Sequence, residues 1–212
     1  MARKRPTASR PRRRTGVRTP KKTLLVFCEG ERTEPEYLTA LRNEPAVRET
    51  AAVDIRLAPE FAGSVPDTLV RRATEALQKA DEEDGEIDEV WCVFDVEWPR
   101  NHPRLKEAVR DATAAGVRLA ISNPCFEIWL TLHFQDQSAW LTTAAAVKLR
   151  RTHDKSVDKG LDGKLYMPRR SEAAARAAAL KKRHHGNESV FPHDNPSSSM
   201  NDLLESVGGL AP

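Results

Sequence analysis

The chain has 212 residues, with 34 Lys and Arg side chains against 31 Asp and Glu, so its formal charge is only +3. No stretch approaches the roughly 18 consecutive apolar residues that a membrane span requires, and the apolar run Leu24–Phe27 is too short for a signal peptide. Three widely separated cysteines support neither a disulfide framework nor a zinc site. From these cysteines and the lack of a long apolar run, we expect a cytoplasmic protein with no membrane partner.

The basic N-terminus is the first segment of the chain. Residues 1–22 contain ten Lys or Arg and no acid, and their Arg-, Pro-, Ser- and Thr-rich composition predicts a disordered tail. Residues 23–147 carry 12 basic and 23 acidic side chains, whereas residues 148–185 carry 12 basic and four acidic ones. The small net charge therefore conceals an acidic body between two basic appendages.

The part from residue 23 to residue 140 alternates between strand and helix patterns. Short apolar runs predict buried strands at residues 23–28, 53–57, 90–94 and 117–121. Capping residues and helical spacing of apolar side chains predict helices that begin near Thr33, Ser64, Leu105 and Phe126. This order indicates an α/β core, residues 23–140, with a parallel sheet of about four strands covered by helices on both faces.

Strand patterns end near residue 140. Residues 141–151 and 171–183 are helical by composition, and Ser199 precedes a last short helix that contains Leu203 and Leu204. We therefore expect residues 141–212 to form a helical, basic C-terminal extension.

Acidic and polar residues follow three of the four predicted strands. In parallel α/β sheets, ligands bind beyond the carboxyl ends of the strands, so these residues are the candidates for a functional site. The candidates are Glu29, Gly30 and Glu34 after the first strand, Asp95 and Glu97 after the third, and Asn123 and Glu127 after the fourth.

Clustered carboxylates repel one another, and a bound cation removes that repulsion. Carboxylate oxygens suit Mg²⁺ or Mn²⁺, which can hold a phosphodiester and lower the pKa of an attacking water. Gly30 allows a sharp turn of the backbone beside Glu29. The pattern predicts a metal site for phosphate chemistry.

Four segments together resemble the RloB-like family over roughly residues 22–207. They are CEGERTEPEY at residues 28–37, VFDVE at 93–97, SNPCFEIW at 122–129 and NPSS at 195–198. The resemblance implies a Toprim-type, Rossmann-like fold, in which a Glu after the first strand and an Asp-x-Asp after the third bind Mg²⁺ for cleavage of nucleic acid. It also implies an association with restriction–modification neighbourhoods and anti-phage defence.

By position, Glu29 matches the Toprim Glu and Asp95 matches the first Asp of the Asp-x-Asp pair. Glu97 replaces the second Asp with a side chain that is one methylene longer and is still able to ligate a metal. Glu127 is a further catalytic candidate, while Glu34 and Asn123 match the family motifs without an assigned role. The resemblance therefore implies Glu29, Asp95 and Glu97 as the metal ligands.

Basic side chains in the C-terminal extension are candidates for phosphate contacts with DNA or RNA, including tRNA. They are Arg150, Arg151, Lys155, Lys159, Lys164, Arg169 and Arg170. Few aromatic residues lie among these charges, so stacking of single-stranded bases is not predicted there.

Two other functions remain open at this point. The acidic edge of the sheet fits a non-catalytic subunit that docks a defence ATPase. Alternatively, Asp95 after a buried strand suits a phosphoryl acceptor in a small-molecule phosphohydrolase or phosphotransferase, with Glu97 as proton donor. The large basic appendages favour a polymeric substrate over that third possibility.

Overall fold

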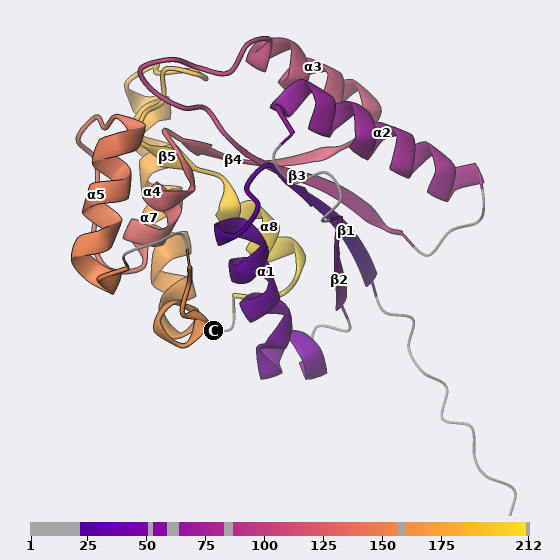
Figure 1. Ribbon diagram of the computed structural model, residues 1–212, viewed down its shortest axis with the longest axis horizontal. Coiled ribbons are helices and arrows are strands. Elements are labelled where there is room, and N and C mark those ends of the chain that lie inside the picture. Colours follow the sequence, from indigo (N-terminus) through magenta and orange to yellow (C-terminus); the bar gives the residue numbers. More distant parts are fainter. Residues whose placement is uncertain (1–21, 51–52, 59–63, 83–86, 157–159, 211–212) are drawn as a thin grey trace, which may run out of the picture.

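A sheet with the strand order β2-β1-β3-β4-β5 runs through the centre of the molecule (Figure 1). The computed structural model describes residues 22–50, 53–58, 64–82, 87–156 and 160–210. The strands are β1 (Lys22–Cys28), β2 (Val53–Leu57), β3 (Glu89–Asp95), β4 (Arg118–Asn123) and β5 (Ser197–Ser198). The first four are parallel, and β5 pairs antiparallel with β4 through Ser122 and Ser198. The predicted α/β fold is thus confirmed, with one strand more than expected.

Helices connect the strands and complete the C-terminal region. They are α1 (Thr33–Asn43), α2 (Pro66–Glu82), α3 (Leu105–Ala115), α4 (Phe126–Leu132), α5 (Thr143–Asp154), α6 (Gly163–Tyr166), α7 (Arg170–Gly186) and α8 (Met200–Ser206). A π-helical turn (Ala46–Thr50) follows α1, and a 3₁₀ turn (Met167–Arg169) joins α6 to α7. Gly116 ends α3 with a φ of 76°, a left-handed conformation that glycine adopts without steric cost.

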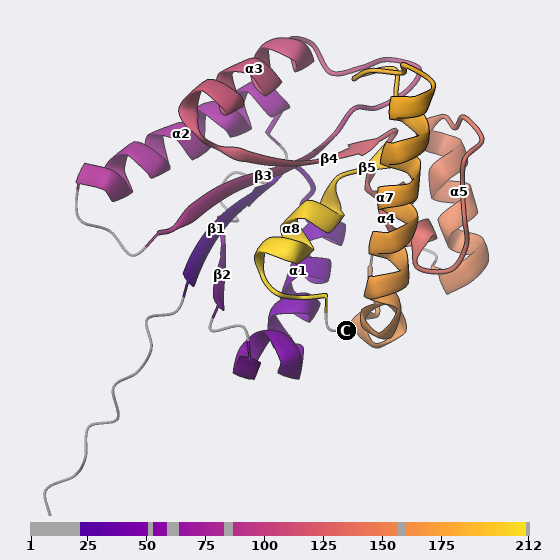
Figure 2. The ribbon, with the colours of Figure 1, turned by 180° about the vertical axis from the view of Figure 1, so that it is seen from behind.

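The two faces of the sheet carry different layers. Helices α2 and α3 cover one face, whereas α1, α4, α7 and α8 lie on the other, with α5 outside α4 (Figures 1 and 2). Strand β3 is buried on both sides, because alternate residues point to opposite faces: Cys92 and Phe94 face α2 and α3, and Trp91 and Val93 face the other layer. This explains its nearly continuous apolar sequence.

The C-terminal helices belong to the same core as the strands. Leu203 and Leu204 of α8 and Ala173 of α7 pack in one apolar cluster with Leu24 and Val26 of β1. The described part of residues 141–210 is therefore mainly helical, apart from β5, and its helices α7 and α8 pack as part of the α/β body. The predicted disordered tail lies outside the described residues, except Lys22, which begins β1. Among the helices of the described part, none is long and apolar enough to cross a membrane.

Candidate functional site

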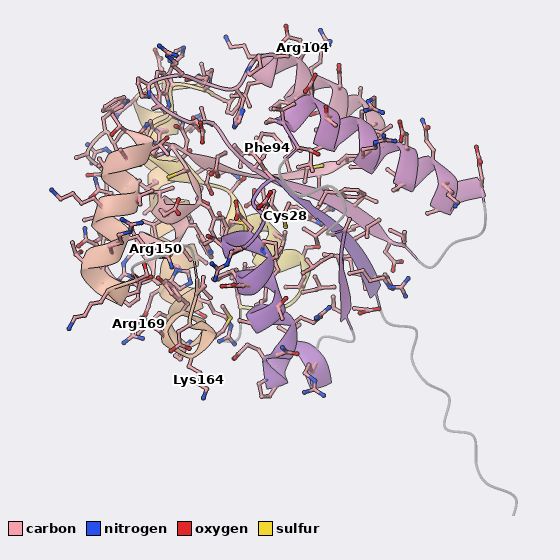
Figure 3. The ribbon with its side chains drawn as sticks, viewed as in Figure 1. Cys28, Phe94, Arg104, Arg150, Lys164 and Arg169 are labelled. Carbon is pink, nitrogen blue, oxygen red and sulfur yellow. The ribbon has the colours of Figure 1, made fainter. Side chains whose placement is uncertain are left out.

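The carboxyl ends of β1, β3 and β4 meet at one edge of the sheet, near Cys28 and Phe94 in Figure 3. Backbone hydrogen bonds continue past the last strand residues, since Glu29 N–H donates to the Val93 carbonyl over 2.9 Å. On the other side of β3, Glu97 N–H donates to the Pro124 carbonyl over 2.7 Å. The residues that follow the strands are therefore held almost as firmly as the strands themselves.

A pocket of about 540 Å³ opens at this edge. Its lining includes every carboxylate that the sequence placed in the candidate site, together with residues from α4 and α5. The lining residues are Glu29, Gly30, Glu31, Arg32, Thr33, Glu34, Asp95, Glu97, Cys125, Phe126, Glu127, Thr143 and Val147. Parallel strands account for this convergence, because their carboxyl ends share one edge.

Asp95 lies at the centre of the negative charge in this pocket. Burial raises the pKa of Asp95 well above its usual range, and the nearby charges of Glu34, Glu29 and Glu127 raise it further. Its Oδ1 is buried and has no hydrogen-bond partner among the described residues. A buried oxygen in this state is unfavourable unless a cation or proton occupies the space beside it.

Gly30 is required by close packing against Glu34. A Cβ atom at position 30 would overlap the carboxylate of Glu34. Glu34 is only 5% exposed and sits in the first turn of α1, beside the pocket. Gly30 therefore leaves space for the buried carboxylate of Glu34, so both Gly30 and Glu34 have a structural role in the segment at residues 28–37.

Glu97 occupies a backbone conformation that is uncommon for its residue type. Its φ is 63°, in the left-handed region, where a side chain with a Cβ costs roughly 1–2 kcal/mol. The hydrogen bond from its N–H to Pro124 holds this conformation and directs the chain along the pocket. Strain of this kind is concentrated at functional sites in proteins generally.

His102 is a site residue that the sequence did not reveal. Its Nε2 lies 2.7 Å from Oε1 of Glu29, while Oε2 of Glu29 accepts a hydrogen bond from the Asp95 N–H. The contact with Glu29 raises the pKa of His102 above its usual value. No spacing signal marks this histidine, because it lies in the long connection between β3 and α3 and reaches Glu29 only through the fold.

The donor set fits a hard divalent cation, since it consists of carboxylates around a buried oxygen without a partner. Within the described residues, however, no three His, Cys, Asp or Glu side chains are preassembled around one metal position. Both oxygens of Glu29 are engaged, by His102 and by the Asp95 amide. Binding of an ion at Glu29 would therefore replace its hydrogen bond from the Asp95 amide or its contact with His102.

Asn123 lies beside the pocket and supports its rim. It is 1% exposed, and its Oδ1 accepts a hydrogen bond from Trp98 Nε1 at 2.8 Å. Its Nδ2 donates to the Pro192 carbonyl and to Asp194, each over 2.9 Å. The residue that matched a motif without a role thus connects the end of β4 to two other segments.

The basic candidates fall into two groups. Arg151, Lys155 and Lys164 are exposed, whereas Arg150 is 2% exposed and pairs with Asp154. This corrects the expectation that Arg150 contacts phosphate, because its guanidinium is enclosed by the protein.

Arg169 and Arg170 are also engaged within the protein. Arg169 donates to the Leu165 carbonyl and lies over the Phe134 ring, and Arg170 donates to the carbonyls of Gly209 and Met167. Figure 3 shows Arg150, Lys164 and Arg169 gathered at the end of the molecule that is remote from α2 and α3. Lys159 lies outside the described residues.

The three cysteines are buried and free. Burial is the main cause that raises the pKa of both Cys28 and Cys125 well above the usual range, so both remain neutral thiols. Neither is activated as a nucleophile, although Cys125 lines the pocket.

Comparison with known families gives one match, to a family described as RloB-like protein, over residues 24–207. No curated protein matches the chain, and no solved structure matches it.

Proposed function

This chain belongs to the RloB-like protein family, and from the pocket around Asp95 we propose that it is a divalent-metal-dependent nuclease with a Toprim-type core. The single observation that carries the proposal is the buried Oδ1 of Asp95, which has no hydrogen-bond partner in the described part of the chain and lies among the carboxylates of Glu29, Glu34 and Glu127. Further support comes from the placement of Glu29 and Asp95 at the ends of two adjacent parallel strands. We propose a role in phage defence on the basis of the family resemblance, and a cytoplasmic location on the basis of the three widely separated cysteines.

The proposed ligands are Glu29, Asp95 and Glu97, with Glu127 beside them. When Mg²⁺ or Mn²⁺ is bound, it supplies charge neutralisation and a water of lowered pKa. The contacts of Glu29 with His102 and the Asp95 amide orient its carboxylate toward the pocket. The rigid backbone at Glu97 limits how far that carboxylate can move, which favours one arrangement of the site.

Cleavage assays test the proposal directly. Plasmid DNA, single-stranded DNA and total tRNA are incubated with the full chain in Mg²⁺, Mn²⁺ or EDTA. We expect metal-dependent cleavage that Asp95→Asn lowers at least about 100-fold, because loss of groups that only support a metal ligand already costs 10- to 100-fold. A matched control is Asp111→Asn, which removes an exposed carboxylate on α3.

The stability of the same variant tests whether unfolding causes the loss of cleavage. Since the raised pKa of Asp95 means that its charge opposes folding, Asp95→Asn should be at least as stable as the wild type at neutral pH. Equal cleavage by the wild type and Asp95→Asn would identify a contaminating nuclease and refute the assignment.

A second function is favoured by one observation, the engagement of both Glu29 oxygens without a preassembled metal position in the described residues. A non-catalytic subunit that docks a defence ATPase through the acidic edge would need no metal. It predicts no cleavage and no calorimetric signal with Mg²⁺ or Mn²⁺. The nuclease predicts both, so the two functions are separated by the same set of assays.

A further inference from the structure

An aromatic cluster is joined to the pocket through Trp98, which follows Glu97 in the sequence and is hydrogen-bonded to Thr143, although none of its rings lines the pocket. Of the large apolar side chains that are exposed in the described residues, Trp140 is the one aromatic, with 55% of its surface exposed. Its ring centre lies 6.0 Å from that of Trp98, and the ring of His193 lies 6.1 Å from Trp98 on a third segment. We call Trp98, Trp140 and His193 the aromatic platform. Three segments distant in the sequence thus bring partly exposed rings together.

Buried polar side chains hold this platform in place. Asn123 fixes the Trp98 indole through its Nε1 and binds the Pro192 carbonyl next to His193. Asn195, 7% exposed, makes two hydrogen bonds to the backbone of Leu141, the residue after Trp140. These buried amides fix the indole of Trp98 and the backbone next to Trp140 and His193.

These two asparagines come from the third and fourth family-like segments of the sequence. Neither lines the carboxylate pocket, and both fix the chain beside the aromatic rings. An exposed Trp loses the favourable burial of a large apolar surface, and a ligand that covers Trp140 would restore it.

The platform is continuous with the carboxylate pocket. Trp98 directly follows Glu97, and its N–H donates to Oγ1 of Thr143 over 3.0 Å. The Thr143 N–H donates back to the Trp98 carbonyl over 3.1 Å. Thr143 lines the pocket together with Asp95 and Glu97. A ligand that extends out of the pocket along Thr143 therefore meets the rings.

We propose that the aromatic platform stacks an unpaired nucleobase of the nucleic acid whose phosphate lies at the carboxylate pocket. This inference rests on the proposed nuclease function and narrows its substrate to single-stranded or looped segments. Stacking is insensitive to charge, so it supplies affinity beside a group of carboxylates that repels the phosphate backbone. The enclosed guanidinium of Arg150 increases the need for such a contact.

Binding without cleavage tests the platform. Labelled single-stranded oligonucleotides, a duplex of equal length and a strand lacking its bases are titrated with full-length Asp95→Asn protein in EDTA. Fluorescence anisotropy is recorded at about 0.2 M salt, which weakens the contribution of the basic residues. In this background, Trp140→Ala should weaken single-strand binding roughly 5- to 150-fold, the range for loss of one base–aromatic stack.

Matched variants separate stacking from general surface effects. Trp140→Phe keeps an aromatic ring and should restore most of the affinity. Val190→Ala removes another exposed apolar side chain, 69% exposed, and should leave binding unchanged. The strand without bases should bind weakly and equally to the parent protein and to Trp140→Ala.

Several results would overturn the inference: binding by Trp140→Ala within twofold of its parent, equal affinity for strands with and without bases, or no preference for single strands over duplex. In each case cleavage by the wild type would stand unaffected. Conversely, if Asp95→Asn cleaves as the wild type does while Trp140→Ala loses affinity, the nuclease assignment fails and base stacking remains.

Discussion

The ion pair of Arg150 with Asp154 and the carboxylates around Asp95 both hold charge in poorly solvated surroundings. In the ion pair, positive and negative charge lie side by side, whereas around Asp95 several negative groups lie together. Arg150 Nε lies 2.7 Å from Asp154, whose carboxylate also accepts a hydrogen bond of 2.6 Å from Tyr166. Although burial raises it, the pKa of Asp154 is held below its usual value by hydrogen bonds from Tyr166 and Ser156 and by the Arg150 charge. Around Asp95, burial and like charges act in the same direction and raise the pKa.

The two regions differ in whether their charged groups are paired within the protein or remain available to bind a ligand. In the ion pair, Arg150 and Asp154 compensate each other's charge and are further bound by the Gly160 carbonyl and Tyr166, so the charge is balanced without any ligand. Around Asp95, by contrast, one buried carboxylate oxygen has no hydrogen-bond partner among the described residues, and neighbouring carboxylates raise the pKa of Asp95. The carboxylate pocket is therefore stable only because the rest of the fold supports it, and a bound cation would complete it.

The largest expected effect comes from breaking the ion pair. Arg150→Met should lower the free energy of unfolding by about 3–5 kcal/mol, since it leaves the Asp154 charge buried without its partner. Urea denaturation measures the change. Arg151→Met, on the exposed side of the same helix, should stay within about 0.5 kcal/mol of the wild type.

The double variant Arg150→Met, Asp154→Leu removes both charges and should recover much of the lost stability. A double variant no more stable than Arg150→Met would show that the ion pair contributes through packing and not through charge compensation. The contrast with the carboxylate pocket would then lose its basis.

Bound Mg²⁺ or Mn²⁺ should stabilise the protein through the carboxylate pocket and not through the Arg150–Asp154 ion pair. At a concentration 100-fold above its dissociation constant, Mg²⁺ or Mn²⁺ should stabilise the wild type by about 2.7 kcal/mol. For a chain of this size the melting temperature should rise by roughly 5–10 °C, and EDTA should reverse the rise. Asp95→Asn should show no such shift, and an equal shift in both proteins would place the ion elsewhere.

Gly30→Ala tests the packing of the pocket. The added methyl group meets the Glu34 carboxylate, so we expect a loss of about 1–3 kcal/mol in stability and a loss of metal-dependent stabilisation. The damage should vanish in the background of Glu34→Ala, where the space is free. As a control, Gly186→Ala adds a methyl group at a position with nothing within 4 Å and should be tolerated.

His133 extends the comparison to a neutral buried group. It is 1% exposed, packs against Tyr37 and Tyr166, and has its pKa lowered to about 4 by burial and by the positive charges of Arg176 and Arg169. The unfolded chain takes up a proton at this site at higher pH than the folded chain. Stability should therefore fall as the pH drops from about 6.5 towards 4, by up to about 1.4 kcal/mol per pH unit.

His133→Gln isolates this contribution, because glutamine keeps hydrogen-bonding capacity without titrating in this range. The variant should have a shallower dependence of unfolding free energy on pH in that window. Parallel curves for variant and wild type would assign the acid sensitivity to the carboxylates instead.

The sequence predicted the four main strands and most helices because each carries its own periodicity. It also brought Glu29, Asp95, Glu97 and Glu127 together, since parallel strands end at one edge. Strand β5 was missed because two serines carry no apolar pattern.

Other features depend on contacts between distant segments. Arg150 and Asp154 have the i,i+4 spacing of a surface ion pair on a helix. They are buried because Tyr166, from another segment, packs against both of them. His102 and the aromatic platform are assembled from separate connections, whose spacing in the sequence carries no information about their contact.

The smallest expected effect concerns the strain at Glu97. Glu97→Gly and Glu97→Ala remove the same carboxylate, but only glycine adopts a φ of 63° without steric cost. After the greater flexibility of glycine in the unfolded chain is subtracted, Glu97→Gly should be about 0.5–1 kcal/mol more stable than Glu97→Ala. At exposed Gln78, inside α2, the same pair of substitutions should have the opposite order, because alanine is favoured in a helix. The same order at both positions would mean that the backbone at Glu97 relaxes when its side chain is removed. Opposite orders at the two positions would show that the fold holds residue 97 in a strained backbone conformation, as is typical of functional sites.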